Sequence, residues 1–378
     1  MRSPGQVWYD ATAGPVGEGR LPMGAHLFAV STPRISCPLS LVALLCVAPL
    51  VSPTAADVFG GGANSFEIEF VSVPVVGEHE VPNVDENGVR ICHRCTIAIP
   101  GNPPDRSGAP SPAGSVPYEY RIGKYEISEQ MIDKANALGG LGITKDTRGP
   151  DKPATNIDWF EAARFVNWLN TSTGHTPAYK FVEVPSPRPS IPPSLEFALW
   201  EPSDAGYNPN NLFRNSRAIY FLPSMNEWYK AAFYDPASGT YFDYPTGSNI
   251  PPIAVASGTA PGTAVFNQDL AAGPADIMQA GGLSPYGTMA QGGNVNEWLE
   301  TKSDLLNDDP SGLRGRRGAS WSALSFSLSA SITRTGLGGS GGTGFRIASV
   351  IPEPRAAILS LIASHAMLGL RIRRSIAR

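Results

Sequence analysis

Few side chains in this sequence belong to the types that perform redox, metal or nucleophilic chemistry. Two of its four cysteines, Cys37 and Cys46, lie in one apolar run, and the other two, Cys92 and Cys95, form its single Cys-x-x-Cys. A zinc site needs a second pair, and c-type haem attachment needs a histidine where Thr96 stands. In an oxidising compartment the pair favours a local disulfide. A redox role stays open, but it requires a βαβ setting, and the preceding residues alternate like a β-strand.

Oxygen ligands are better represented than nitrogen or sulfur ligands. The histidines after residue 56 are widely separated, at His79, His93 and His175, so an iron or zinc centre rich in histidine is not expected. The segment from Ser284 to Glu300 joins a glycine turn to Asn294, Glu297 and Trp298. Carboxylate, amide and backbone oxygens are the ligands that calcium prefers. A packed tryptophan over a hydrogen-bonded turn explains the same pattern, so both interpretations stay open.

Two helices and a strand are expected to position these residues. Tyr118 to Ile127 alternates like a strand and leads into a helix-like stretch from Ser128 to Leu138. Pro153 to Asn170 has an apolar face at helical spacing, and Asn156 is expected to cap that helix.

A further helix is predicted within Tyr220 to Phe233. Ser224 is expected to be its cap, with Glu227 three residues later to complete a capping box. Thr176 to Ser216 is dotted with proline and has little periodicity, which is typical of a long surface loop. Five tryptophans are expected in the core: Trp159, Trp168, Trp228, Trp298 and Trp321.

The composition limits the classes of fold and partner. Of 378 residues 42% are hydrophobic, which is enough for a sizeable core. Forty glycines and 36 prolines predict a loop-rich fold with short regular elements rather than long helical bundles. Charged residues make up 16%, with 33 acidic against 29 basic, so no basic surface is expected for nucleic acid.

Both ends of the chain have the pattern of sorting signals. Cys37 to Val51 is an apolar run of signal-peptide length, preceded by Arg34, and small residues end at Ala56, after which we expect cleavage. Residues 1–56 are thus predicted to be a signal peptide with extra N-terminal residues, because Met23 would give a more ordinary start. A buried core helix is the alternative for the apolar run.

The C-terminal residues 351–378 follow a tripartite pattern. They read IPEP at 351–354, then an apolar run at 356–370, then RIRRSIAR. The run is short for a bilayer span, which needs about 20 apolar residues, so transient membrane anchoring is favoured. The pattern resembles the PEP-CTERM sorting tails of bacteria, which implies an exosortase-type processing enzyme as partner and a final location in the cell envelope or outside the cell.

A series of motifs between these ends occurs in a specific order. The series comprises YEIS at 125–128, the helix WFEAARFVNWLN, FLPSMNEWYKAA, YPTG at 244–247, GGNVNEW at 292–298, RGASW at 317–321 and GFR at 344–346. It resembles the formylglycine-generating enzyme (sulfatase-modifying factor) family over residues 116–350. The resemblance implies an α+β fold related to C-type lectin-like domains, with little regular structure. Residues 57–115 are expected to be a β-like lead-in segment and linker.

The resemblance carries expectations about copper. Formylglycine-forming members bind copper through two cysteines five residues apart, shortly after the RGASW-like motif, since Cu(I) requires soft thiolates. Those positions fall at Ala323 and Leu328, so copper and oxidase chemistry are not expected. The sulfoxide-synthase branch needs histidines that the chain lacks. Ser320 is left as the one residue of a catalytic type at a family active-site position.

Calcium is the other metal that the resemblance implies. One family site combines an upstream Asp or Asn side chain with backbone carbonyls and the glutamate of the GNVWEW-like motif. Here Ala290 stands at the upstream position, which leaves Gly293, Val295 and Glu297, and the asparagine of the other site is replaced near Val265. Calcium therefore stays an alternative and no cofactor is expected.

The residues of a site indicate a protein's function more directly than its fold does. The missing cysteines favour an exported, envelope- or matrix-associated domain that binds a peptide, protein or glycan without catalysis. Ser320, Arg334 and Arg346 would line its vestigial cleft, together with Ala323 and Leu328 at the former cysteine positions. The alternative is an oxidase that modifies an exported sulfatase or peptide through other ligands. A third interpretation, a structural matrix protein, predicts no saturable ligand.

Overall fold

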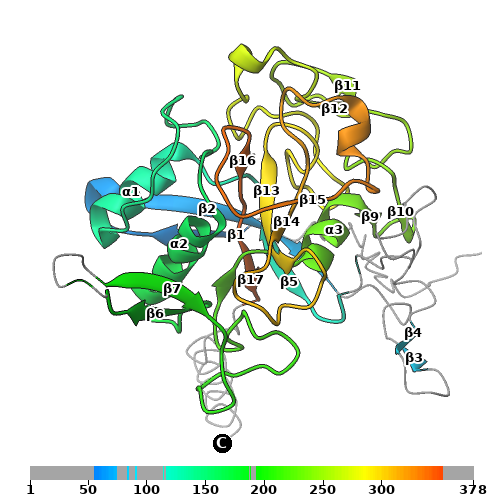
Figure 1. Cartoon of the computed structure of the whole chain (residues 1–378). Helices are drawn as coiled ribbons and strands as arrows, with labels where there is room; N and C mark the ends of the chain where they lie inside the picture. The colour runs from blue at the N-terminus through cyan, green and yellow to red at the C-terminus, as the bar shows by residue number, and fades with distance from the viewer. Residues whose placement is uncertain are drawn as a thin grey trace, which may run out of the picture. The chain divides into compact units, whose positions relative to one another are not determined.

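The computed structural model describes residues 55–74, 83–84, 90–91, 114, 116–186, 188 and 193–351 (Figure 1). The predicted disulfide between Cys92 and Cys95 lies outside the described residues, as do the apolar runs at both ends. Within the described part, no helix has the length and apolar character needed to cross a bilayer.

The central sheet has five antiparallel strands in the order β1-β2-β5-β17-β8. Their bounds are β1 Ala55–Phe59, β2 Phe66–Val73, β5 Tyr120–Gly123, β17 Ala348–Val350 and β8 Tyr220–Phe221. In β2 alternate residues such as Phe66, Ile68 and Phe70 are buried, as a strand with one face on the core requires. The lead-in segment thus contributes two strands to this sheet, and the expected cleavage point after Ala56 falls inside β1.

Three α-helices are found among the described residues. Helix α1, Glu129–Gly139, was predicted as a helix-like stretch from Ser128 to Leu138. Ser128 is its N-cap, and its side chain accepts a hydrogen bond from the backbone N–H of Met131. Helix α3, Met225–Phe233, has the capping box predicted between Ser224 and Glu227.

The cap of helix α2, Trp159–Ser172, differs from the prediction. Its N-cap is Asp158, which forms a capping box with Glu161. Asn156 has φ 62° and therefore lies in the left-handed region, whereas an N-cap adopts extended backbone. The Asn156 prediction was wrong because the glutamate at the third helical position selects Asp158 as its partner.

Helix α2 packs on the central sheet through aromatic rings. The ring of Phe66 in β2 lies 6.3 Å from that of Phe165 and 6.0 Å from that of Trp168, centroid to centroid. All five tryptophans predicted in the core are buried. Three of them, Trp159, Trp168 and Trp298, belong to one core cluster, which joins helix α2 to the central sheet.

A second sheet carries parts of three of the seven sequence motifs, GGNVNEW, RGASW and GFR. Its order is β15-β14-β13-β16, with β13 Asn296–Lys302, β14 Arg314–Arg317, β15 Arg334–Gly336 and β16 Thr343–Gly344. The remaining short elements are β3 Asn83–Val84, β4 Arg90–Ile91, β6 Lys180–Val184, β7 Ser194–Ala198, β9 Tyr234–Asp235, β10 Thr240–Tyr241, β11 Ile253–Ala254, β12 Thr263–Ala264, η1 Gly62–Asn64, η3 Leu270–Ala272 and η4 Ser325–Leu328. Short strands joined by long loops confirm the predicted loop-rich α+β class.

The stretch from 176 to 216 is more than the surface loop that its prolines predicted. Strands β6 and β7 form a hairpin, and the ring of Phe197 lies 5.1 Å from both Trp159 and Phe213. The prediction failed because these contacts join residues far apart in the chain, so they leave no periodicity.

The outer edge of β8 is occupied by a side chain of helix α2. Fully buried Asn170 accepts hydrogen bonds from the backbone N–H groups of Ile219 and Tyr220 and donates to the carbonyls of Tyr220 and Val166. Such a side chain satisfies backbone groups that would otherwise be buried without partners.

Replacing Asn170 by leucine is expected to destabilise the fold by about 3 kcal/mol, because each orphaned buried polar group costs about 1–3 kcal/mol. Urea unfolding of the full chain measures the loss. Asn167→Leu, one turn earlier, is the comparison: its amide pairs with one residue, Tyr179, so it should cost less. Equal losses would show that the β8 edge does not depend on Asn170.

Candidate functional site

Ser320 lines a cleft of about 490 Å³. Its lining comes from five places in the chain: Arg148, Leu270, Asn296, the turn from Ser320 to Ser322, and the stretch from Ser340 to Gly342. Ala319, directly before Ser320, has φ 70°, a conformation that is strained for a residue with a Cβ and that gathers at functional sites. Ser320, which the sequence analysis placed in a vestigial cleft, is thus one of the residues that line this cleft.

Arg148 is a cleft residue that sequence analysis missed. Its guanidinium is paired with Asp146 at 2.9 Å, donates to the Gly341 carbonyl at 3.0 Å and lies 5.1 Å from the centre of the Trp321 ring. Asn296 also lines the cleft, and its buried Oδ1 has no hydrogen-bond donor among the described residues. Arg148 comes from an irregular loop, so no local pattern marked it.

The two positions at which the resemblance places copper-binding cysteines lie in an apolar cluster. Leu328 is buried with Phe266 and Ala319, and Ala323 packs against this cluster. Neither side chain can ligate a metal, and no group of three or more His, Cys, Asp or Glu side chains arranged for a metal ion occurs in the described ranges.

The structure separates the two arginines that were predicted to line the cleft with Ser320. Arg334 in β15 is exposed and donates to the Ser327 hydroxyl at 3.1 Å. Arg346 is fully buried, so its placement in a cleft was wrong. Its Nε and Nη2 each donate to Glu297 at 2.6 Å, a bidentate pair with no exposure on either side chain.

A second buried carboxyl lies beside this pair. Burial raises the pKa of Glu126 well above its usual range, and the charge of Glu297 raises it further. Asn294 donates to Glu126 Oε2 at 2.6 Å, while Oε1 has no partner among the described residues. The sequence did not mark Glu126, because its neighbours Asn294 and Glu297 are distant along the chain.

The residues predicted for calcium do not fit that ion. Both oxygens of Glu297 are taken by Arg346, and Oε2 also accepts from the Trp228 indole at 2.6 Å. Ala290 offers no side-chain oxygen, so Gly293 and Val295 would contribute backbone carbonyls alone. A hard cation prefers six to eight oxygen ligands, and the buried guanidinium already balances the charge here.

Removing calcium is therefore expected to leave stability unchanged. The melting temperature of the full chain should agree within about 1 °C between excess EDTA and millimolar calcium chloride, because a ligand stabilises only the state that binds it. Magnesium chloride at the same ionic strength is the control. A rise of several degrees with calcium alone would show that an ion reaches the GGNVNEW turn.

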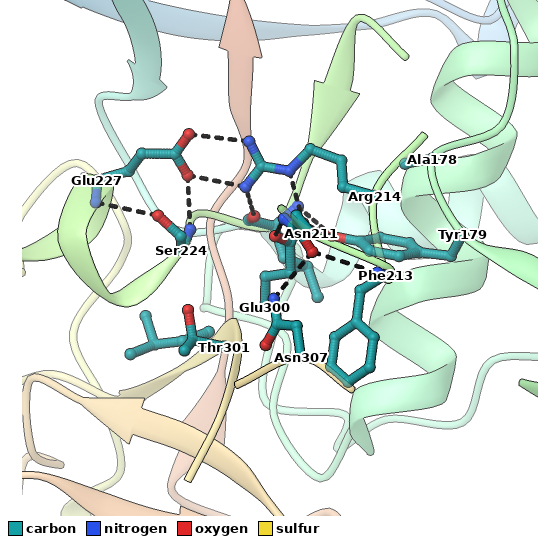
Figure 2. Close-up of polar contacts among 12 residues, drawn as sticks. Ala178, Tyr179, Asn211, Phe213, Arg214, Ser224, Glu227, Glu300, Thr301 and Asn307 are labelled. Carbon is teal, nitrogen blue, oxygen red and sulfur yellow. Dashed lines mark hydrogen bonds and ion pairs between the residues drawn. The ribbon is translucent and has the colours of Figure 1, made fainter. Parts of the chain in front are cut away.

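A second cleft, of about 710 Å³, shares no lining residue with the first. At its floor Arg214 lies between two buried glutamates, as Figure 2 shows. Its Nη1 and Nη2 donate to Glu227 at 2.9 Å, and its Nε donates to Glu300 at 2.7 Å. Tyr179 and Asn211 also donate to Glu300, at 3.0 and 2.6 Å. The sequence predicted none of this network.

The two carboxyls respond differently to the shared arginine. Burial alone would raise the pKa of Glu227, but the charge of Arg214 and its hydrogen bonds lower that pKa below its usual range. Burial raises the pKa of Glu300. The charge of Arg214 and its hydrogen bond lower that pKa, and repulsion from Glu227 raises it. One guanidinium thus forms ion pairs with two buried carboxyl groups.

Comparison with solved structures finds several similar chains of low identity. Treponema denticola variable protein 1 is 18% identical, with a TM-score of 0.47 over 78% of this chain and 99% of that one. CarF is 19% identical, with a TM-score of 0.44 over 75% and 99%. PvdO from Pseudomonas aeruginosa is 14% identical, with a TM-score of 0.44 over 78% and 98%. No curated protein matches the chain.

A match to a family model gives the sequence family. Residues 98–351 match the sulfatase-modifying factor enzyme 1-like domain, called FGE-sulfatase, which extends the 116–350 range of the motif series toward the N-terminus. That range covers more than half of the 378 residues and includes both clefts. This chain belongs to the sulfatase-modifying factor enzyme 1-like domain family.

Proposed function

We propose that this chain is an exported, non-catalytic member of its family that binds a peptide or protein segment in the Ser320 cleft. The observation that carries the proposal is the apolar character of Ala323 and Leu328. An oxidase of this family needs two thiolates there to hold Cu(I), and soft thiolates cannot be replaced by methyl groups. The family motifs around the cleft are present in this chain, whereas the two thiols that would bind Cu(I) are absent from these two positions.

The lining of the cleft favours a peptide as ligand. Hydroxyls and an amide lie beside the Arg148 and Trp321 pair, and Leu270 at the edge is 71% exposed. Leu324 and Phe326, which follow the cleft turn, are 57% and 59% exposed. Polar groups that fix a backbone next to apolar groups that accept side chains are common in peptide sites.

The test is a binding and turnover assay on the full chain with a cysteine-containing, sulfatase-type peptide. We expect saturable binding by fluorescence polarisation, no aldehyde by mass spectrometry, and no tight Cu(I). Ser320→Trp should abolish binding, while Ser257→Trp, at an exposed site outside the cleft, should not. Tight copper with aldehyde formation would overturn the proposal and favour the oxidase, with Cys92 or Cys95 supplying thiolate.

Export is the other part of the proposal, and it is supported by the signal pattern of residues 1–56 and the tail pattern of residues 351–378. After cleavage following Ala56, the mature chain would begin at Asp57, whose carboxylate binds Arg121 at 2.5 Å and Tyr220 at 2.9 Å. N-terminal sequencing of the secreted protein tests this. A chain that keeps residues 1–56 in the cytoplasm would contradict export.

A further inference from the structure

The second cleft has the size and form of a preformed ligand site. Its volume of about 710 Å³ lies within the range of small-molecule pockets, about 300–1,000 Å³. Its outer wall is the loop after β13, which carries Leu305, Leu306 and Asn307. Leu306 is 62% exposed at the mouth, and Leu305 has φ 71°, a strained conformation that the surrounding contacts must hold.

The wall loop is tied down at both ends. Lys302 forms ion pairs with Asp304 at 2.9 Å and with Asp308. Arg314 donates to the Pro310 carbonyl at 3.0 Å, and the Asn307 amide donates to Asn211 on the opposite wall at 3.0 Å. A ligand entering such a cleft loses less free energy to ordering of the protein.

Each cation at the described part of the cleft is paired with carboxylates, and the carboxylates outnumber the cations. Arg214 is paired with Glu227 and Glu300, and Lys302 with Asp308. No unpaired cation among the described lining residues is available for a phosphate, sulfate or carboxylate. The cleft therefore offers little attraction to an anionic ligand.

The strand edge beside the cleft is closed to an extended peptide. Asn170 bonds both backbone groups of Tyr220, the Tyr179 hydroxyl accepts from the Leu222 N–H at 2.9 Å, and Arg214 approaches the Leu222 carbonyl at 3.4 Å. Peptides that add a strand to a sheet need these groups free. The polar groups that remain belong to side chains.

The cleft also has amide donors next to an aromatic ring. Asn208, Asn210 and Asn226 line it, and their Nδ2 groups have no acceptor in the described structure, while the Oδ1 atoms of Asn208 and Asn226 each accept one backbone N–H, from Asn210 and Gly114, and keep a second lone pair. Each amide both donates and accepts, as the adjacent hydroxyls of a sugar do. Tyr118 is 46% exposed, with its hydroxyl fixed on Glu227 at 2.7 Å, so its ring can pack against the apolar face of a pyranose.

We propose that this second cleft binds a neutral oligosaccharide. Neutral hydroxyl groups match the amides, the surplus of carboxylates over cations disfavours anions, and the closed β8 edge disfavours extended peptides. Together with the Ser320 cleft, it would let one domain contact a protein segment and a glycan at once.

Isothermal titration of the full chain with cellohexaose, maltohexaose and chitohexaose tests the proposal, and hexagalacturonate serves as the anionic comparison. At least one neutral sugar is expected to bind with a Kd below about 1 mM, at least about tenfold more tightly than hexagalacturonate. Asn210→Trp, which fills the mouth, should abolish that binding. Asn249→Trp, at an exposed asparagine outside the cleft, and Ser320→Trp should leave it unchanged.

Three results would overturn the proposal: no neutral sugar binds below that limit, hexagalacturonate binds as tightly, or Asn210→Trp leaves binding intact. Peptide binding that is blocked by Asn210→Trp instead of Ser320→Trp would assign this cleft to peptides. Because the two clefts have separate blocking variants, failure of one proposal does not imply failure of the other.

Discussion

Arg346→Met is expected to destabilise the folded chain by about 3–5 kcal/mol, because it leaves the fully buried Glu297 carboxylate without its counter-charge. Three further contacts are lost with the guanidinium, since it also donates to the carbonyls of Gly123, Lys124 and Met289. Methionine keeps much of the side-chain volume, so the loss reports charge and hydrogen bonding more than a cavity. Urea unfolding of the full chain measures it.

Two variants serve as controls for this prediction. Arg334→Met removes an exposed arginine that the sequence assigned to the same cleft, and it should change stability by less than about 0.5 kcal/mol. Combining Arg346→Met with Glu297→Gln removes both charges and keeps an acceptor for Trp228, so the double variant should be more stable than Arg346→Met alone. Equal losses for Arg334→Met and Arg346→Met would contradict a desolvated ion pair.

Arg334 and Arg346 also show that the burial of a charged side chain could not be predicted from the sequence. Both follow the RGASW motif, and both are of the type that clamps carboxylates. Only tertiary contacts distinguish them: Arg346 meets Glu297, 49 residues earlier in the chain, while Arg334 meets a nearby serine. Burial of a charge is decided by such distant partners, so neither composition nor local spacing could predict it.

Local chemistry, by contrast, was predictable. The capping box of α3 needs only Ser224 and Glu227, three residues apart, and its prediction is confirmed. The same rule identifies the cap of α2, because Glu161 stands three residues after Asp158, but the prediction placed the cap at Asn156. The motif order predicted the family over 116–350, within the 98–351 match, because it records many such local features together.

The Arg214 network of the second cleft could not be predicted from sequence, because it depends on contacts between distant residues rather than on local chemistry. Arg214 lies in a proline-dotted stretch without periodicity, and its partners Glu227 and Glu300 are 13 and 86 residues away. The segment looked like a surface loop because its order depends on aromatic and ionic contacts with other elements. A charged residue in an irregular stretch carries no signal that separates a solvated side chain from a buried one.

Arg214→Met is expected to cost about 3–5 kcal/mol near neutral pH, because two buried carboxylates lose one shared guanidinium. The cost should depend on pH. In the variant, burial and mutual repulsion raise the pKa of both Glu227 and Glu300 above the value of 4.5 for an unperturbed glutamate. The folded variant then binds more protons than the unfolded chain, so its stability falls as the pH rises above that value.

The native chain behaves differently at Glu227. There the folded pKa is lowered, so this group contributes stability above its unfolded pKa and loses it only as the pH falls through the folded value. The gap in unfolding free energy between native chain and Arg214→Met should therefore widen from pH 5 to pH 8, as followed by urea unfolding. Arg217→Met, an exposed arginine three residues along, should show no such gap. A gap that is constant with pH would mean that the pKa values of the two carboxyls do not rise when Arg214 is removed, and the pairing of Figure 2 would then not be ionic.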